Sequence, residues 1–586
     1  MNLRTIPLLA GLAAVVLVAA PARSQQQIEA KVDLAWNRYY PTEEVGAILQ
    51  RLAAAHPDLA SLDIIGESHE GRPMWLFTIN NPETGNDLDK PAIYIDGSIH
   101  ANEIQATETV LYSIWYLLEA YDEVPAIRDL VDRTAWYFVP IVNPDGRASW
   151  FDEPHTPNSS RTGVAPIDDD NDGLFDEDGP DDLDGDGFIE MMWRKDPFGT
   201  HRRNPRDPRQ FERVSTEPRA DGTREYGDWS MAGQEGIDND GDGRINEDAK
   251  GGYDMNRNWP SGWQPDHVQR GAGAYPLCWP ETRAVAEFIL SKPNIAAGQA
   301  YHNTGGMILR GPGASWRESD YPRQDVAVYD EIAKAGAEML PFYRPMVIHA
   351  DLYTVHGGFV NWIAEGLGIV SFTNELWTEK RILQNGENPD SEAQQRWQDR
   401  VLFGQTWSDW QEVEHPEYGT VLVGGGTKFS SRIPPPFMLE EECHRNFAFT
   451  AFHAGEMPLL RFEAIKATPL DGGLWQLDVA IRNDRLIPSR TARAADKGIG
   501  TPDRLTVSVA GGAVVAAGTM RNGLSTTFDP VANRPESLLV EGGIPGRDTR
   551  WFRFIVKAAA GSDITIAYQA EKATDLETTF ALEASE

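Results

Sequence analysis

The chain has 586 residues, 41% of them hydrophobic, which is enough for two or three domains with sizeable cores and excludes a disordered chain. Its 53 basic and 89 acidic residues give a net charge of -36. Nucleic acid and anionic membrane surfaces are therefore not expected partners, because both bind clustered Lys and Arg. The two cysteines, Cys278 and Cys443, cannot build a disulfide framework, and whether they pair stays open. A metal site must therefore use histidine and carboxylate.

The first residues have the features of a secretory signal peptide. Arg4 precedes an apolar run from Ile6 to Ala20, and Ala22-Arg23-Ser24 is a small-x-small cleavage pattern. The run is shorter than the ~20 apolar residues that span a bilayer. We expect a signal peptide over residues 1–24, cleaved near Ser24, and a secreted or periplasmic protein without a membrane span in the mature chain.

The next part of the chain alternates short apolar runs with helical periodicity. This pattern predicts an α/β fold, a mainly parallel mixed sheet flanked by helices, in a domain over residues 25–456. The expected helices cover 43–55 and 107–121, and the expected strands cover 74–79, 92–95 and 135–142. Further buried helices and strands are expected at 281–290, 326–339 and 367–373.

The pattern changes after about Met457. Trp475, Leu477, Val479 and Ile481 alternate with other residues, and similar period-two runs recur at 505–509, 551–556 and 564–568. Such runs, separated by turns rich in Gly, Pro and Asp, predict a C-terminal antiparallel β-sandwich over residues 457–586.

One segment is strongly acidic, with twelve acidic residues and no basic ones between Asp168 and Glu190. Three D-x-D-x-D-G motifs present oxygens on alternate residues around a tight turn, as Ca²⁺ requires. None has a Glu at the twelfth position, so they are not regular EF-hands. We expect bound calcium, with solvated acidic turns as the alternative. The candidate ligands are Asp168, Asp170 and Asp172, then Asp182, Asp184 and Asp186, and finally Asp238, Asp240 and Asp242.

His100 and Glu103 follow the predicted strand 92–95 and a turn at Gly97-Ser98, where an α/β sheet normally places its ligands. Their three-residue spacing points both side chains the same way, as a shared zinc needs. Taken alone, an HxxE pair is more often an incidental surface pair, so the assignment depends on the rest of the chain.

Five further motifs follow in a specific order. They are Asn143-Pro144-Asp145-Gly146, Asp254-Met255-Asn256-Arg257-Asn258-Trp259, Tyr301-His302-Asn303-Thr304, Tyr353 before Gly357-Gly358, and Ser371-Phe372-Thr373-Asn374-Glu375-Leu376. In this order, and with the entry segment His69-Glu70-Gly71-Arg72-Pro73, the chain resembles the zinc carboxypeptidases of the carboxypeptidase A type, the M14 metallopeptidases. The resemblance covers roughly residues 36–377.

The resemblance implies a catalytic centre with one zinc per chain, held by His100, Glu103 and His302. It also implies that Glu375 is the general base that takes a proton from the zinc-activated water; the alternative is a buried carboxylate in a structural pair. Arg194, in Trp193-Arg194-Lys195, is the matching arginine for the developing oxyanion, although Arg202 or Arg203 could serve instead.

The resemblance also implies the substrate, a peptide or protein with a free C-terminus. Asn256 and Arg257 match the pair that holds the terminal carboxylate, and Tyr353 matches the mobile tyrosine that closes over it. Val360 falls where the family sets side-chain preference, which predicts an apolar or aromatic terminal residue. Two departures are Asn102, where pancreatic-type members commonly carry Arg, and an insertion over 148–252 that carries the Asp-rich motifs.

The sequence therefore predicts an exported zinc metallocarboxypeptidase, a peptide hydrolase. Two alternatives remain: an amidase or peptidase acting on cell-wall stem peptides, and an inactive calcium-dependent binding protein. The physiological substrate, the role of the β-sandwich and the oligomeric state are left open by the sequence.

Overall fold

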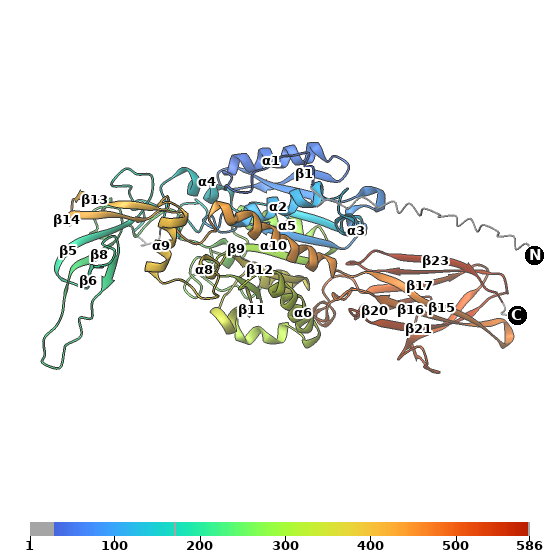
Figure 1. Cartoon of the computed structure of the whole chain (residues 1–586). Coiled ribbons are helices and arrows are strands. Elements are labelled where there is room, and N and C mark those ends of the chain that lie inside the picture. The colour runs from blue at the N-terminus through green and yellow to red at the C-terminus, as the bar shows by residue number, and fades with distance from the viewer. Residues whose placement is uncertain (1–27, 169–171, 584–586) are drawn as a thin grey trace, which may run out of the picture.

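The computed structural model describes residues 28–168 and 172–583. The expected signal peptide and Asp170 lie outside these residues, so export and that calcium ligand stay predictions. The molecule is elongated, with an α/β body in the middle, a small β lobe at one end and a β-sandwich at the other (Figure 1). Among the described residues, no helix has the length and apolarity needed to cross a membrane.

The body is built on an eight-stranded sheet with strand order β1-β2-β4-β3-β9-β12-β10-β11. Strands β4, β3, β9 and β12 are parallel neighbours at its centre. Antiparallel pairs β2·β4 and β10·β12 flank them, β1 is antiparallel to β2, and the edge strand β11 is parallel to β10. The mixed sheet that the sequence predicts is therefore confirmed. The strands are β1 (Ala60–Glu67), β2 (Pro73–Ile79), β3 (Ala92–Gly97), β4 (Ala135–Val139), β9 (Ile295–Asn303), β10 (Met307–Arg310), β11 (Arg344–Val347) and β12 (Val370–Leu376).

Helices cover both faces of this sheet. Alternate residues of a central strand enter different cores: Ile93 and Ile95 pack with helices α1, α2, α3, α6 and α10, whereas Tyr94 packs with α5 and α7. Cys443, on α10, is buried, Cys278 is partly exposed, and both are free thiols. The bounds are α1 (Thr42–Ala55), α2 (Gln105–Glu119), α3 (Pro125–Arg133), α5 (Pro280–Leu290), α6 (Arg323–Met339), α7 (Phe359–Leu367) and α10 (Pro436–Gly455).

The small lobe is a six-stranded antiparallel sheet with strand order β13-β14-β5-β8-β6-β7. Four of its strands come from the insertion, and two come from the chain after α9 (Ser391–Val401). The sequence analysis did not predict this sheet, because its strands are short or carry charged residues rather than regular apolar alternation. They are β5 (Met191–Gly199), β6 (His201–Arg203), β7 (Phe211–Arg213), β8 (Gly227–Gln234), β13 (Trp407–His415) and β14 (Gly419–Gly426).

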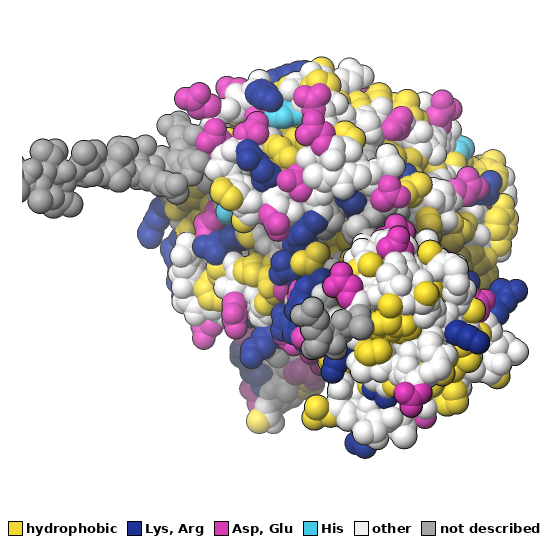
Figure 2. Space-filling view, turned by 90° about the vertical axis from the view of Figure 1, so that its right-hand side faces the viewer, with side chains coloured by type: hydrophobic (Ala, Val, Ile, Leu, Met, Phe, Trp, Pro, Cys, Tyr) yellow, Lys and Arg dark blue, Asp and Glu magenta, His cyan; other side chains and the backbone are white. Residues whose placement is uncertain are grey.

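The C-terminal region consists of antiparallel sheets of five and four strands, as the sequence predicts. Apolar side chains from both sheets, including Leu477, Phe554 and Ile566, share one core. Acidic and basic side chains are interspersed over this end of the molecule (Figure 2). The strands are β15 (Leu460–Leu470), β16 (Leu474–Asn483), β17 (Asp503–Val509), β18 (Ala513–Met520), β19 (Asp529–Pro530), β20 (Ser537–Val540), β21 (Thr549–Lys557), β22 (Asp563–Gln569) and β23 (Leu576–Ala581).

Candidate metal centre

The sheet brings together residues that lie far apart in the sequence. Strands β3, β9 and β12 are adjacent and parallel, so their carboxyl ends meet at one edge of the sheet. His302 lies one residue before the end of β9, and Glu375 of β12 is its direct register partner. His100 and Glu103 come from the loop that follows β3. Four predicted site residues therefore share one site.

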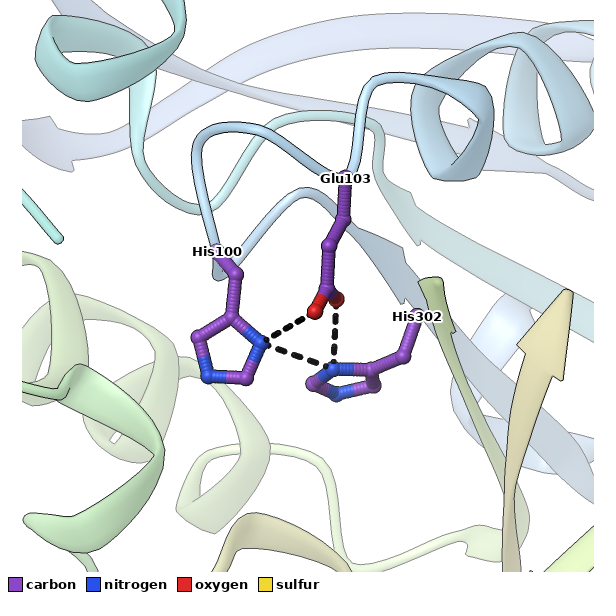
Figure 3. A group of neighbouring side chains, drawn as sticks. All are labelled: His100, Glu103 and His302. Carbon is purple, nitrogen blue, oxygen red and sulfur yellow. Dashed lines mark hydrogen bonds and ion pairs between the residues drawn. The ribbon is translucent and has the colours of Figure 1, made fainter. Parts of the chain in front are cut away.

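His100, Glu103 and His302 form a compact buried triad (Figure 3). The Nδ1 atoms of the two histidines are 3.1 Å apart. The Glu103 carboxylate oxygens lie 3.0 Å from Nδ1 of His100 and 2.9 Å from Nδ1 of His302. Burial alone would raise the pKa of Glu103, but the two histidines hold it well below its ordinary value. Two imidazole nitrogens and an ionised carboxylate converging on one point are a donor set that suits zinc.

Asp254 contacts the triad through the imidazole nitrogen of His100 that faces away from the centre. Its Oδ1 lies 3.0 Å from Nε2 of His100, which orients the imidazole so that Nδ1 faces the centre. Its Oδ2 accepts a hydrogen bond of 3.1 Å from Nε of Arg161. Burial would raise the pKa of Asp254, but the cations around it, chiefly Arg257, hold the pKa well below its ordinary value.

Two arginines approach the triad, and neither is Arg194. Arg161 donates from Nη1 to Oε1 of Glu103 at 3.0 Å, and Nη2 of Arg432 lies 3.6 Å from the same oxygen. Arg194 lies on β5 in the small lobe, where its exposed guanidinium covers the ring of Tyr418 at 5.4 Å. The structure therefore does not bring Arg194 to the triad, because the strand that carries it belongs to a different sheet.

The alternatives to Arg194 also lie in that lobe. Arg202 pairs with Glu212 at 2.6 Å, and the guanidinium of Arg203 covers the ring of Phe211 at 5.3 Å. Both contacts hold these arginines within the small sheet.

Glu375 is partly buried beside the triad. Burial and the neighbouring negative charge of Glu103 raise the pKa of Glu375 to about 7. A carboxyl group with this pKa can accept a proton near neutral pH and release it again.

Asn256 and Arg257 lie in a short 3-10 turn, η3 (Met255–Arg257), next to the triad. Nδ2 of Asn256 is 3.5 Å from Nε2 of His302, and Nη2 of Arg257 is 3.7 Å from Oδ2 of Asp254. Gly357 packs against this turn with a positive φ of 62°, and a Cβ there would lie 2.2 Å from the carbonyl oxygen of Arg257. The close approach therefore requires glycine.

Tyr353 and Val360 differ in exposure. Tyr353 is 58% exposed and follows the π-helix η5 (Ile348–Leu352). Val360 is buried at the start of α7 and packs with Leu309 and Ile348. The side chain of Tyr353 therefore faces solvent, and Val360 forms part of an apolar wall.

The Asp-rich motifs form groups of facing carboxylates. Asp238, Asp240 and Asp242 place one oxygen each within 4.8 Å of one another, and Asp240 also groups with Asp172 and Glu177. Asp182 and Asp184 group with Glu235, and Asp184 and Asp186 group with Glu190. Asp168 belongs to none of these groups within the described residues; its carboxylate accepts the N–H groups of Asp172 and Gly173.

Two of the loops are copies of one twelve-residue repeat, 168–179 and 238–249, with the shared pattern D-x-D-x-D-G-x-x-x-E-D. Asp178 and Asp248, at equivalent positions, form an antiparallel bridge. The amide of Asn246 donates to Asp178 at 2.8 Å, and the amide of Asp176 donates to Asp248 at 3.1 Å. The two copies therefore hold each other in place by reciprocal contacts.

Sequence reasoning missed Arg161 and Arg432 at the centre, and Glu190 and Glu235 in the insertion. Arg161 is 58 residues from Glu103 in the chain, and no spacing rule connects them. The internal repeat was visible in the sequence and would have indicated that the acidic loops pair. The spacing in the sequence also identifies Glu190 as a candidate ligand. It stands eight residues after Asp182, in the ninth position of the loop, which often contributes a calcium ligand.

Comparison with family models gives two matches. A model described as zinc carboxypeptidase matches residues 45–182 and 183–401. A model described as a domain of unknown function matches residues 459–581, the β-sandwich.

Individual proteins also match. Carboxypeptidase B of Astacus astacus is 37% identical over 116 residues, which cover 20% of this chain and 36% of that protein. Carboxypeptidase D of Rattus norvegicus is 34% identical over 115 residues, 20% of this chain and 8% of that protein. The matches thus span about a third or less of these relatives. The solved carboxypeptidase A of Helicoverpa armigera has a TM-score of 0.44 at 18% identity, covering 74% of this chain and 77% of that one.

Proposed function

This chain belongs to the zinc carboxypeptidase family, and from that premise we propose that it removes C-terminal residues from peptides. Members of the family use zinc, which polarises a water and the scissile carbonyl when bound. The observation that carries the proposal is the convergence of His100, Glu103 and His302 on one buried point.

The donor chemistry of the triad supports a single zinc with these three ligands. The two Nδ1 atoms and the Glu103 oxygens lie 2.9 to 3.1 Å apart, so a small ion could be shared by all of them. Asp254 keeps His100 in the orientation and tautomer that a metal needs. Three protein ligands leave the fourth position for water or substrate, as a catalytic site requires.

We assign Glu375 as the general base. It lies beside His302 in the register of the sheet, and its raised pKa of about 7 suits a group that takes a proton from water and passes it to the leaving amine. The carboxylate is held on a central strand, so its position is fixed by the sheet.

We assign Arg161, in place of Arg194, as the cation that faces the oxygen of the scissile carbonyl. Its guanidinium already contacts Glu103 and Asp254, and its side chain remains 36% exposed. A planar guanidinium with remaining donors can stabilise negative charge that develops beside the triad.

The substrate end is assigned to Asn256, Arg257 and Tyr353. Arg257 has a single carboxylate contact among the described residues, to Asp254 at 3.7 Å, so it can accept a terminal carboxylate as a second partner. The exposed Tyr353 can close over that group. The apolar wall that contains Val360 favours an apolar or aromatic terminal side chain.

We further propose that the Asp-rich motifs of the insertion bind calcium. The groups of facing carboxylates support this, because oxygen ligands at close range are what Ca²⁺ prefers. The repeat copies at 168–179 and 238–249 would then present two related loops.

The experiment compares two peptides that differ only in a free or amidated C-terminus, with an apolar last residue. We expect one zinc per chain, loss of hydrolysis on chelation and recovery on adding zinc. The amidated peptide should be cleaved at least about 100-fold more slowly, because it cannot give the buried Arg257 the terminal carboxylate as a second ionic partner. Equal rates on both peptides would contradict carboxypeptidase action and favour an amidase or endopeptidase.

A further inference from the structure

A cluster of five carboxylates lies at one end of the small lobe. Two overlapping groups share Asp184: one contains Asp182 and Glu235, and the other contains Asp186 and Glu190, with oxygens within 4.8 Å in each. We propose that these five residues form one calcium site, in which Glu190 and Glu235 are ligands. This inference rests on the proposed calcium binding of the insertion and identifies the residues that complete one site.

Glu190 is the observation that distinguishes this cluster from an ordinary acidic loop. Its side chain is buried, with 3% of the residue exposed, and neither carboxylate oxygen has a hydrogen-bond partner within the described chain. The same holds for Oδ2 of Asp184. The nearby hydroxyl of Ser408 does not change this, because it donates to Asp186 at 2.6 Å.

Positive side chains are also missing from this cluster. No ion pair found among the described residues includes any of its five acids (Asp182, Asp184, Asp186, Glu190, Glu235). Burying a carboxylate without a partner is costly unless a cation neutralises it. A bound cation would neutralise these carboxylates while they stay ionised.

Calcium fits the cluster better than zinc does. All the donors are oxygens, and five carboxylates can supply the six to eight ligands that Ca²⁺ takes. Asp182 accepts the amides of Gly185 at 2.8 Å and Gly187 at 2.9 Å, which holds the loop closed around the candidate site. Glu235 accepts the amides of Leu183 and Glu190, so it is already directed toward this loop.

The position of the ligands indicates what the ion does. Glu190 directly precedes β5, Glu235 directly follows β8, and Asp186 is bonded to Ser408 on β13. One ion would therefore tie the acidic loop to three strands of the six-stranded sheet. We infer a structural brace for the small lobe that takes no part in the chemistry at the triad.

The experiment is a calcium titration by calorimetry on the full zinc-loaded protein, comparing Glu190→Gln with Glu217→Gln. Glu217 is an exposed acid of the same insertion and serves as the matched control. We expect Glu190→Gln to weaken one calcium-binding step at least about tenfold, because the site loses a charged ligand. Glu217→Gln should bind calcium and hydrolyse peptide as the native protein does.

Melting temperatures separate a ligand from a residue that only supports the fold. Without calcium, Glu190→Gln should melt at or above the native protein, because an uncompensated buried charge is gone. With calcium, the native protein should gain several degrees and the variant less than half of that gain. A lower melting temperature of the variant in both conditions, with calcium affinity unchanged, would overturn the inference.

The remaining outcomes distinguish this inference from the proposals on which it rests. If only Asp240→Ala weakens calcium binding, the ion belongs to the 238–242 loop and the five-carboxylate site is wrong. If the native protein binds no calcium, both calcium proposals fail. Zinc content and peptide hydrolysis, measured on the same samples, test the carboxypeptidase proposal independently of either result.

Discussion

The metal triad and the five-carboxylate cluster both bury acidic side chains, but their surroundings are opposite. Glu103 has two imidazoles and a guanidinium within 3.0 Å. Glu190 faces other carboxylates, and its oxygens have no hydrogen-bond partner in the described chain. At the triad the chain supplies its own positive groups. At the cluster no side chain of the described residues forms an ion pair with the five acids, and the proposed calcium ion would supply the positive charge.

The two sites also differ in how the chain assembles them. His100 and His302 are 202 residues apart and meet because parallel strands end at one edge of the sheet. Four of the five cluster residues lie between Asp182 and Glu190, so a local loop collects most of the charge. A rigid sheet can hold a charge-balanced site in position before any ligand binds, whereas a loop of like charges is held by what it binds.

The largest effect on turnover is expected beside the metal triad, for the substitution Glu375→Gln. Turnover should fall at least about 100-fold with zinc still at one per chain, because the amide keeps the shape of the side chain but cannot accept a proton. The measurements are kcat on a free-acid peptide and metal content by elemental analysis. As a control, Glu379→Gln, just beyond the end of β12, should keep kcat within about twofold. Native turnover in the Glu375 variant would remove this residue from the mechanism.

A smaller effect should separate the two candidate arginines. Arg161→Gln should lower kcat/KM by about 10- to 100-fold, because the carbonyl oxygen loses a charged donor, and Arg161→Lys should recover part of the loss. Arg194→Gln, at an exposed position of β5, should stay within about twofold of the native value. Zinc content is measured on each variant to separate catalysis from metal retention. The reverse ranking would restore Arg194 as the residue that acts on the substrate.

The sequence predicts the body of this fold because its central strands are buried on both faces and read as continuous apolar runs, such as Ala92 to Ile95. The same strands bring His100, Glu103, His302 and Glu375 together, so the motif order was enough to predict that these four residues meet. Arg161 was missed because it lies in an insertion with no periodic pattern. The family pattern favoured Arg194 instead, but that residue lies on a strand of the separate lobe.

The small lobe escaped prediction for a related reason. Its strand β5 contains Arg194, Lys195 and Asp196 and is partly exposed, so neither alternation nor an apolar run marks it as a strand. Glu235 lies near Glu190 only because β5 and β8 pair with each other. The sequence analysis did not predict this pairing of strands. The spacing of the Asp residues predicts the acidic loops, but the sequence analysis did not include their buried partners Glu190 and Glu235.

A third carboxylate sharpens the comparison, because the buried Asp503 is hydrogen-bonded to neutral hydroxyl groups, and the charges of Arg490 and Glu571 act on it more weakly. Its Oδ2 accepts hydrogen bonds from Ser489 and Tyr568 in the β-sandwich. Burial raises the pKa of Asp503 to about 6. We expect the smallest effect here, on the pH dependence of stability, and it should be removed by Asp503→Asn.

The sign follows from which state holds the proton. Unfolded Asp503 ionises near its ordinary pKa of about 4, whereas the folded group stays protonated up to about pH 6, so folding binds protons between these values. The free energy of unfolding should fall by up to about 3 kcal/mol as pH rises from about 4 to 6, and then level off. Hydrogen exchange of the β17 and β22 amides, measured at pH 5 and pH 7, assigns the change to the sandwich. Asp563→Asn, an exposed acid on β22, is the control and should keep the native slope. If the free energy of unfolding of Asp503→Asn depends on pH as it does in the native protein, Asp503 does not take up a proton on folding. Its hydroxyl partners would then hold the carboxylate ionised throughout, as the cations at the triad do for Glu103.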